Sequence, residues 1–238
     1  MRGWVGIAVL ALIALAGVWV WRDYQAWLAL GPGGASADVR GWIAVTQQGL
    51  AGRDGLDTTR YDKTIAEQKE CAFLGGYLPK REGRRPHVGH WIAPHRQLDQ
   101  FAAPDMKKRG EALFTEAAAQ DAERLTIKKS AIEAGTDALF VKMASEGATM
   151  ESEAGHVHTN DGAMHVIVGA ADAATVIETQ WGQAHPLAGR GNLPDGYVMV
   201  YAPRNERDLV IAQRILIAAI GHAGRYRCIN LSAGEQKP

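Results

Sequence analysis

The chain has few cysteines for its size, with only two among 238 residues. Cys71 and Cys228 lie far apart, and neither belongs to a C-x-x-C pair. The sequence therefore contains no zinc-ribbon motif and no thioredoxin-type redox motif. Two cysteines allow one disulfide, but so sparse a content favours two free thiols in a reducing compartment.

The chain also lacks an excess of charge of either sign, because 26 Lys and Arg residues balance 26 Asp and Glu residues. Proteins that bind nucleic acids usually carry a basic surplus, so no nucleic-acid partner is expected. Apolar residues at 47% and charged residues at 22% are normal for a folded domain. The length suits one domain of ordinary size with an additional membrane segment.

One long apolar run lies at the N-terminus. No charged residue occurs from Gly3 to Trp21, and a helix of this length would span about 28 Å, close to the thickness of a bilayer core. Trp4 lies near one end and Trp19 near the other, where indole rings prefer the membrane interfaces. We therefore predict a single-pass membrane protein anchored by residues 3–21.

A cleaved signal peptide is the alternative interpretation of this run. Ala14-Leu15-Ala16 is compatible with a cleavage site. Apolar residues continue through Val18 and Val20, however, and a single Arg precedes the run. These features favour an uncleaved anchor, while the flanking charges leave its orientation open.

The remaining chain is predicted to form one domain. Residues 1–30 would form the anchor and its helical extension, and residues 31–238 the folded domain, because Gly31-Pro32-Gly33-Gly34 breaks the helix. The spacing lacks a regular βαβ order, which predicts an α+β fold with a small, mostly antiparallel sheet packed by helices. Hydrophobic periodicity and capping residues predict helices at 39–50, 104–124, 171–179 and after Asn205, and strands at 87–92, 125–132, 138–143, 164–168 and 196–201.

A predicted hairpin over residues 155–169 contains three histidines. Asp161-Gly162 is a strong turn signal. A two-residue loop would pair His158 with His165, whereas a four-residue loop would pair His156 with His165. In both registers the three histidines share one face, because side chains alternate along a strand.

Three imidazoles on one sheet face can hold a transition metal ion or accept protons near neutral pH. The plainer alternative is a set of partly exposed histidines that pair with one another and with Asp161. The third histidine makes a functional site the favoured interpretation. The sequence leaves the metal content and the oligomeric state open.

Two other stretches combine polar and aromatic residues. The predicted loop 180–190 contains Trp181, Gln183 and His185, and such a loop either lines a site or places its Trp in the core. At a strand-to-helix junction, Arg204 and the free N–H groups of the helix start could hold an enolate oxygen. The alternative is that Arg204 pairs with a nearby acid.

These motifs together resemble the fungal luciferase family, the light-emitting oxygenases of luminous mushrooms and their relatives in non-luminous fungi and bacteria. Residues 107–151 show no match. The matching stretches run in order along the chain: Arg22-Asp23-Tyr24-Gln25 after the membrane segment, Gly31-Pro32, Arg40-Gly41, Leu78-Pro79, Arg81-Glu82-Gly83, Arg85-Pro86, the pair His156 and His158 with His165, Trp181-Gly182-Gln183, His185-Pro186-Leu187-Ala188-Gly189, and Tyr201-Ala202-Pro203-Arg204-Asn205-Glu206.

The resemblance implies an oxygenase that acts on a hydroxylated pyrone or a similar enolic small molecule. Molecular oxygen would be the co-substrate, without an organic cofactor, and light emission is left open. The predicted catalytic residues are His156, His158, His165 and His185, and the predicted substrate-binding residues are Asp161, Trp181, Gln183 and Arg204. In this hypothesis His158 or His165 removes a proton from the enol, Arg204 and His185 hold the negative charge, and Trp181 stacks on a flat ring.

Two other functions compete with this interpretation. The first is a metalloprotein in which His156, His158 and His165 bind a transition metal in a cupin-like site. The second is a non-catalytic, membrane-tethered domain that binds a small molecule. Stoichiometric metal would favour the first, and binding without oxygen uptake would favour the second.

Overall fold

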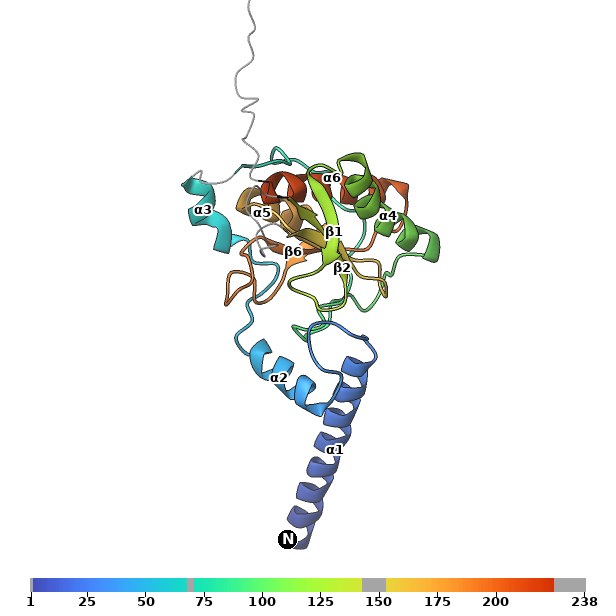
Figure 1. Cartoon of the computed structure of the whole chain (residues 1–238). Coiled ribbons are helices and arrows are strands. Elements are labelled where there is room, and N and C mark those ends of the chain that lie inside the picture. The colour runs from blue at the N-terminus through green and yellow to red at the C-terminus, as the bar shows by residue number, and fades with distance from the viewer. Residues whose placement is uncertain (1, 68–70, 143–152, 225–238) are drawn as a thin grey trace, which may run out of the picture.

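The computed structural model describes residues 2–67, 71–142 and 153–224. Figure 1 shows a long N-terminal helix that projects from a mixed helix and sheet domain. The elements of the described residues are α1 (Arg2–Leu28), α2 (Val39–Gly49), η1 (Thr59–Tyr61), α3 (Asp62–Ala66), α4 (Pro104–Gln120), β1 (Leu125–Lys129), β2 (Asp137–Val141), β3 (Glu153–Val157), β4 (Met164–Ile167), α5 (Ala170–Glu178), β5 (Gly182–Ala184), β6 (Tyr197–Val200) and α6 (Glu206–Ala223).

The strands form one antiparallel sheet in the order β1-β2-β3-β4-β6-β5. This confirms the predicted α+β class. The strand predicted at 87–92 is wrong: the structure has only an isolated bridge from Val88 to Gln97 there, because Pro86 and Gly89 interrupt the segment. Sequence reasoning missed β5, whose three residues are too few to show a pattern.

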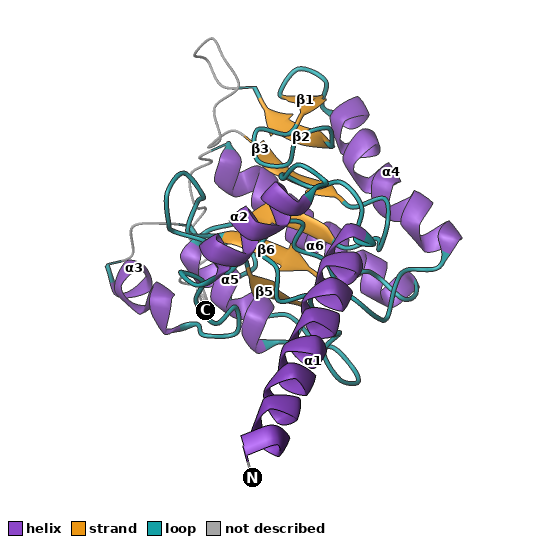
Figure 2. Cartoon of the chain, turned by 90° about the horizontal axis from the view of Figure 1, so that it is seen from below, coloured by secondary structure: helices purple, strands orange, loops and turns teal. Residues whose placement is uncertain are grey.

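The main hydrophobic core lies on one face of the sheet, against α5 and α6. Figures 1 and 2 place α5 and α6 on one side of the sheet and α1 and α2 on the other. On the helix side, Val157, Met164 and Val166 share a buried core with Ile215 and Leu216 of α6. The histidines alternate with these residues and therefore project to the opposite face.

Helix α6 begins where its sequence predicted. The Asn205 side chain accepts a hydrogen bond from the Asp208 backbone N–H at 3.0 Å, which satisfies one of the free donors of the first turn. The acids Glu206 and Asp208 lie in that turn, where the helix dipole favours negative charge. The helix then packs one apolar stripe over the centre of the sheet.

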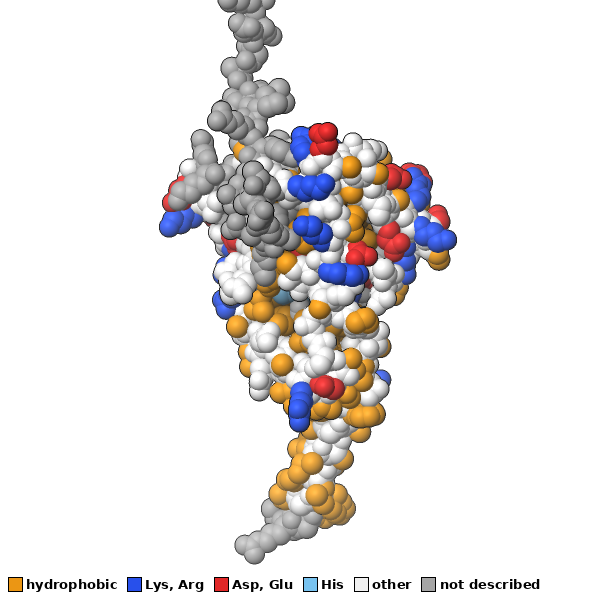
Figure 3. Space-filling model, in the orientation of Figure 1, with side chains coloured by type: hydrophobic (Ala, Val, Ile, Leu, Met, Phe, Trp, Pro, Cys, Tyr) orange, Lys and Arg blue, Asp and Glu red, His pale blue; other side chains and the backbone are white. Residues whose placement is uncertain are grey.

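Helix α1 contacts the domain only near its C-terminal end. Its stretch Trp4–Leu28 is long and apolar enough to cross a bilayer, and no residue of its apolar 18-residue window is buried by the rest of the described chain; a signal sequence has the same properties. Figure 3 shows apolar side chains along this helix and on the adjoining part of the domain. At the junction Trp27 is buried and donates to the Ala93 carbonyl at 2.8 Å, and Trp42 donates to Asp23 at 2.8 Å.

The cysteine prediction needs correction. Cys71 is disulfide-bonded, and no free cysteine occurs in the part of the chain that the structure describes. The expectation of two free thiols is therefore wrong, because a low cysteine content does not report on pairing. Cys228 lies outside the described residues.

Candidate active site

The hairpin of β3 and β4 sets the geometry of the site. Its register pairs His156 with His165, and the loop 159–162 is closed by two backbone bonds, from His158 N–H to the Ala163 carbonyl at 2.8 Å and from Gly162 N–H to the His158 carbonyl at 2.9 Å. The four-residue alternative is thus confirmed. The prediction that all three histidines share one face is also confirmed.

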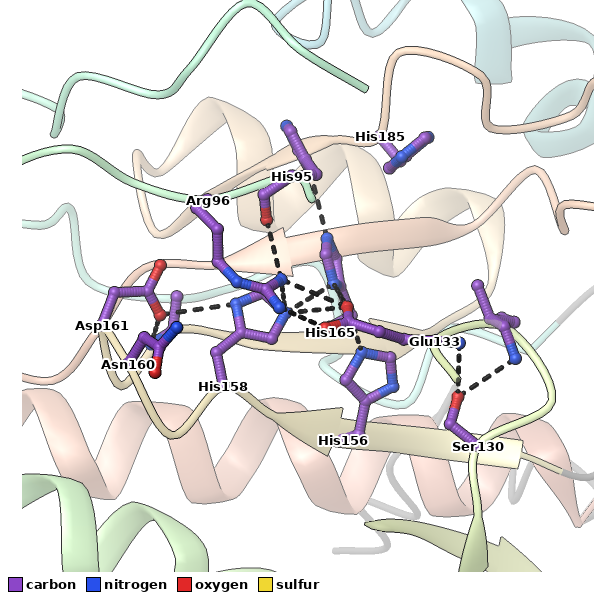
Figure 4. A network of polar contacts seen from close by, with 12 residues as sticks. His95, Arg96, Ser130, Glu133, His156, His158, Asn160, Asp161, His165 and His185 are labelled. Atoms are coloured by element: carbon purple, nitrogen blue, oxygen red, sulfur yellow. Dashed lines mark hydrogen bonds and ion pairs between the residues drawn. The ribbon is translucent and has the colours of Figure 1, made fainter. Parts of the chain in front are cut away.

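Figure 4 shows the three imidazoles beside two side chains from distant loops. Arg96 donates to His158 Nε2 at 2.9 Å and forms an ion pair with Glu133. Glu133 Oε2 lies 3.3 Å from His156 Nε2, 3.6 Å from His158 Nε2 and 4.0 Å from His165 Nδ1. We call Arg96, Glu133, His156, His158 and His165 the histidine–glutamate cluster.

The cluster is closed to solvent. His156, His158 and His165 expose at most 2% of their surface, which excludes the partly exposed set considered from sequence. One ring nitrogen of each histidine faces inward, and His158 Nε2 lies 2.9 Å from His165 Nδ1. Buried polar atoms at such spacing must share protons or a ligand, because burying them unpaired is costly.

The outward ring nitrogens of His156 and His165 each have a hydrogen-bond partner, and that of His158 faces Asp161 at ion-pair distance without a hydrogen bond in the described residues. His156 Nδ1 lies 3.0 Å from a Glu153 carboxylate oxygen, which also accepts from Ser130. His158 Nδ1 lies 3.4 Å from Asp161 Oδ1, and His165 Nε2 lies 3.1 Å from His95 Nδ1. These contacts orient all three rings.

Charge and burial set the protonation of the cluster. Burial alone would lower the pKa of His156, but contacts with Glu133 and Glu153 outweigh it and raise that pKa. Burial and neighbouring charges lower the pKa of His158 and, more strongly, that of His165, so both are neutral at pH 7. Burial opposes the ionised form of Glu133, yet His156 and Arg96 hold its pKa well below the usual range.

Two cavities adjoin the cluster. The larger has a volume of about 460 Å³, and its wall includes Arg96 and His158 together with Phe114 and Ile127. This volume is within the range of small-molecule sites. The smaller, about 140 Å³, is bordered by residues that include Glu133 and His165.

His185 and Gln183 lie near the cluster without entering it. The His185 ring is 4.9 Å from that of His95, and its Nε2 donates to the Ile92 carbonyl at 2.8 Å. Burial lowers the pKa of His185 to about 4, so the ring is neutral at pH 7. Gln183 accepts from the Tyr201 hydroxyl at 3.1 Å and lies 3.4 Å from His95.

Trp181 and Arg204 lie elsewhere. Trp181 is buried in the main core and donates to the Pro79 carbonyl at 2.6 Å, and Arg204 pairs with Asp208 at 2.6 Å. Both border a separate cavity of about 30 Å³, and neither lines the two cavities beside the cluster. Arg96 occupies the place beside the histidines that the sequence suggested for Arg204.

Sequence reasoning missed four groups at the site. His95 and Arg96 come from the loop before α4, Glu133 from the turn between β1 and β2, and Glu153 from the start of β3. No spacing rule joins these positions to residues 156–165. Only Glu153 carried a local signal, because it precedes His156 by three residues.

Comparison with known proteins places the chain in a family. A Luciferase domain family matches residues 151–219, which include the histidine hairpin. Luciferases from Armillaria mellea and Armillaria ostoyae are 30% identical over 91% and 90% of this chain and 85% of their own length. The luciferase from Neonothopanus nambi is 28% identical over 84% of this chain and 80% of its own length. No solved structure matches the chain.

This degree of identity over nearly the full length is decisive for the family. The protein combines an α+β fold, a buried histidine–glutamate cluster beside a cavity, and an apolar N-terminal helix. The chain belongs to the fungal luciferase family.

Proposed function

We propose that this protein is a luciferase-like oxygenase that oxidises a hydroxylated pyrone or a similar enolic compound with molecular oxygen and without an organic cofactor. Residues 3–21 would anchor it in a membrane as a single-pass protein. Light emission is a further property that the oxygen chemistry permits. The observation that carries the proposal is the buried histidine–glutamate cluster at the wall of the larger cavity in a chain of the luciferase family.

The larger cavity offers a flat ring both apolar surface and a guanidinium. Phe114, Ile127 and Val157 supply apolar surface on its wall, and Arg96 and His158 supply polar groups from the cluster, while Glu111 and Asp137 also border the cavity, so the enolate oxygen would face Arg96. An enol bound with its oxygen toward Arg96 would lose its proton readily, since a buried guanidinium favours the enolate. Removal of one such donor to an oxyanion typically lowers a rate by about 10²–10³-fold.

The proton from the enol needs an acceptor. In the protein without a bound ion, His158 is placed for this role, because it lines the cavity and its lowered pKa keeps it neutral. The electron-rich carbon of the enolate would then form a carbon–oxygen bond with O₂, leaving a peroxide anion beside Arg96. Proton removal by a positioned base contributes about 10²–10⁴-fold.

Oxygen uptake with a panel of 4-hydroxy-2-pyrones tests the proposal. We expect the full-length protein in detergent to consume oxygen with at least one member of the panel, and photon counting on the same samples tests light emission. The variant Arg96→Met should reduce oxygen uptake by at least 10²-fold. His87→Ala should retain full uptake, because the exposed His87 lies outside both cavity walls. Pyrone binding without oxygen uptake would instead support the binding-domain alternative.

A further inference from the structure

We infer that Glu133, His156, His158 and His165 form a binding site for one divalent transition metal ion. Each residue offers one ligand atom, and the four atoms lie within 4.8 Å of one another. Three imidazoles and one carboxylate are the ligand set that Fe²⁺, Mn²⁺, Cu²⁺ and Zn²⁺ accept, whereas Mg²⁺ prefers oxygen atoms alone.

The spacing of the inward atoms fits one central ion. With bonds of about 2.1 Å, neighbouring ligands lie about 3.0 Å apart in an octahedron and about 3.4 Å apart in a tetrahedron, and opposite octahedral ligands about 4.2 Å apart. His158 Nε2 and His165 Nδ1 are 2.9 Å apart, and Glu133 Oε2 is 3.3, 3.6 and 4.0 Å from the three imidazole nitrogens. These four of the six separations lie close to these values, and all four ligand atoms lie within 4.8 Å of one another.

One inward ring nitrogen, Nε2 of His156, is buried and has no hydrogen-bond partner in the described part of the chain. Glu133 Oε2 lies within 3.3 Å of it, but the two are not aligned for a hydrogen bond. A buried nitrogen aimed at a carboxylate oxygen and two further imidazoles is what a metal site presents when the ion is absent.

The contacts of the outward ring nitrogens also bear on a metal site. Histidine ligands usually donate their other N–H to a carboxylate, a carbonyl or a comparable acceptor, which fixes the tautomer. Here His156 faces Glu153, His158 faces Asp161, and His165 faces His95 Nδ1. The outward hydrogen bonds of His156 and His165 direct their other ring nitrogens inward, whereas His158 Nδ1 lies at ion-pair distance from Asp161 and makes no hydrogen bond within the described residues.

The charges of the buried groups also call for a cation. Three buried acidic residues, Glu133, Glu153 and Asp161, face the three imidazoles, and Arg96 pairs with Glu133. A divalent ion held by Glu133 and the imidazoles would add positive charge to this acidic group. Asp161 also accepts hydrogen bonds from the backbone N–H groups of Gln97 and Ala163.

The ion would remain reachable by substrate. Four protein ligands leave room for one or two others, and His158 and Arg96 border the larger cavity while Glu133 and His165 border the smaller one. Arg96 would give up its hydrogen bond to His158 Nε2 and keep its pairing with Glu133. The metal would take over the role of His158 as proton acceptor, and this part of the inference rests on the proposed function.

Metal content measured independently of activity tests the site. We would purify the full-length protein in detergent through a tag without histidines, determine bound metals by mass spectrometry, and remove them with EDTA. The metal-free protein would then be titrated with Fe²⁺ under anaerobic conditions, Mn²⁺, Zn²⁺ or Mg²⁺ while its melting temperature is followed. We expect about one transition metal ion per chain and a rise in Tm with at least one of the first three ions but not with Mg²⁺.

Variants locate the ion. His165→Gln should lose the metal and the Tm response, and His87→Ala should keep both. If His165→Gln does not fold, Glu153→Gln serves instead: it retains all four ligands and should weaken metal affinity by about 10–100-fold. Purified protein that holds no metal and shows no Tm response to any of the ions would overturn the site, as would unchanged affinity in the folded variants.

The two proposals can fail separately. Oxygen uptake that persists in EDTA-treated protein would overturn the metal site's part in the reaction and retain the oxygenase. A bound metal without oxygen uptake on any enolic compound would retain the site and overturn the proposed oxygenase.

Discussion

Replacement of Arg96 by Met tests the electrostatics of the cluster. Arg96 and Glu133 expose only 5% and 8% of their side chains, so solvent screens their interaction little. Arg96→Met keeps most of the apolar volume but leaves an ionised carboxylate that has lost its guanidinium partner. Breaking a buried pair in this way typically costs about 3–5 kcal/mol, which for a chain of this size lowers Tm by about 6–20 °C.

The matched control is Arg84→Met. Arg84 pairs with Asp99, but its side chain is 61% exposed, and exposed pairs contribute about 1 kcal/mol or less. Both variants would be melted in detergent after EDTA treatment and again with saturating metal. The metal should restore part of the loss in Arg96→Met, because the ion replaces the missing positive charge beside Glu133. A loss of less than 1 kcal/mol in the metal-free Arg96→Met variant would refute an ionised, Arg-paired Glu133.

Three further predictions concern the anchor, the last helix and the buried His185. Full-length protein should stay in the membrane pellet after a carbonate wash, since Trp4–Leu28 can span a bilayer; release of the intact chain would contradict this. Asn205→Ala should lower the free energy of unfolding by about 1 kcal/mol, because Asn205 caps Asp208 N–H, whereas Asn205→Asp should be close to neutral in thermal melts. Burial lowers the pKa of His185 to about 4, so between pH 4 and 6.5 the unfolded chain binds a proton that the folded chain does not. The free energy of unfolding of EDTA-treated protein should therefore decrease as the pH is lowered from 6.5 to 4, by about 3 kcal/mol from this residue. The same pH dependence in His185→Gln would contradict this contribution.

The fold was predictable where local signals were strong. The charge-free run, the N-cap at Asn205 and the Asp161-Gly162 turn each act over a few residues, and each element appears at its expected place. The alternation around residues 156–168 separated the core face from the histidine face. The short strand β5 was missed because a strand of three residues carries no periodicity.

The sequence predicted the three histidines of the cluster but not Arg96 or Glu133. The hairpin rule brought the three histidines together, because strand pairing follows from turn length. Arg96 and Glu133 reach the cluster through loops whose paths are set by packing over the sheet. Their positions, 60 and 23 residues before His156, follow no local rule. Arg204, by contrast, had a plausible local signal but pairs with Asp208.

X-ray absorption at the edge of the bound metal tests the central claim most directly. In protein purified with its native metal, we expect nitrogen and oxygen ligands at about 2.0–2.2 Å from the ion, with the outer scattering of three imidazole rings. The metal-edge signal should be lost in His165→Gln, which no longer holds the ion, and the imidazole contribution should remain unchanged in His87→Ala. A spectrum without imidazole scattering, or one identical in all three proteins, would contradict a metal bound by Glu133, His156, His158 and His165.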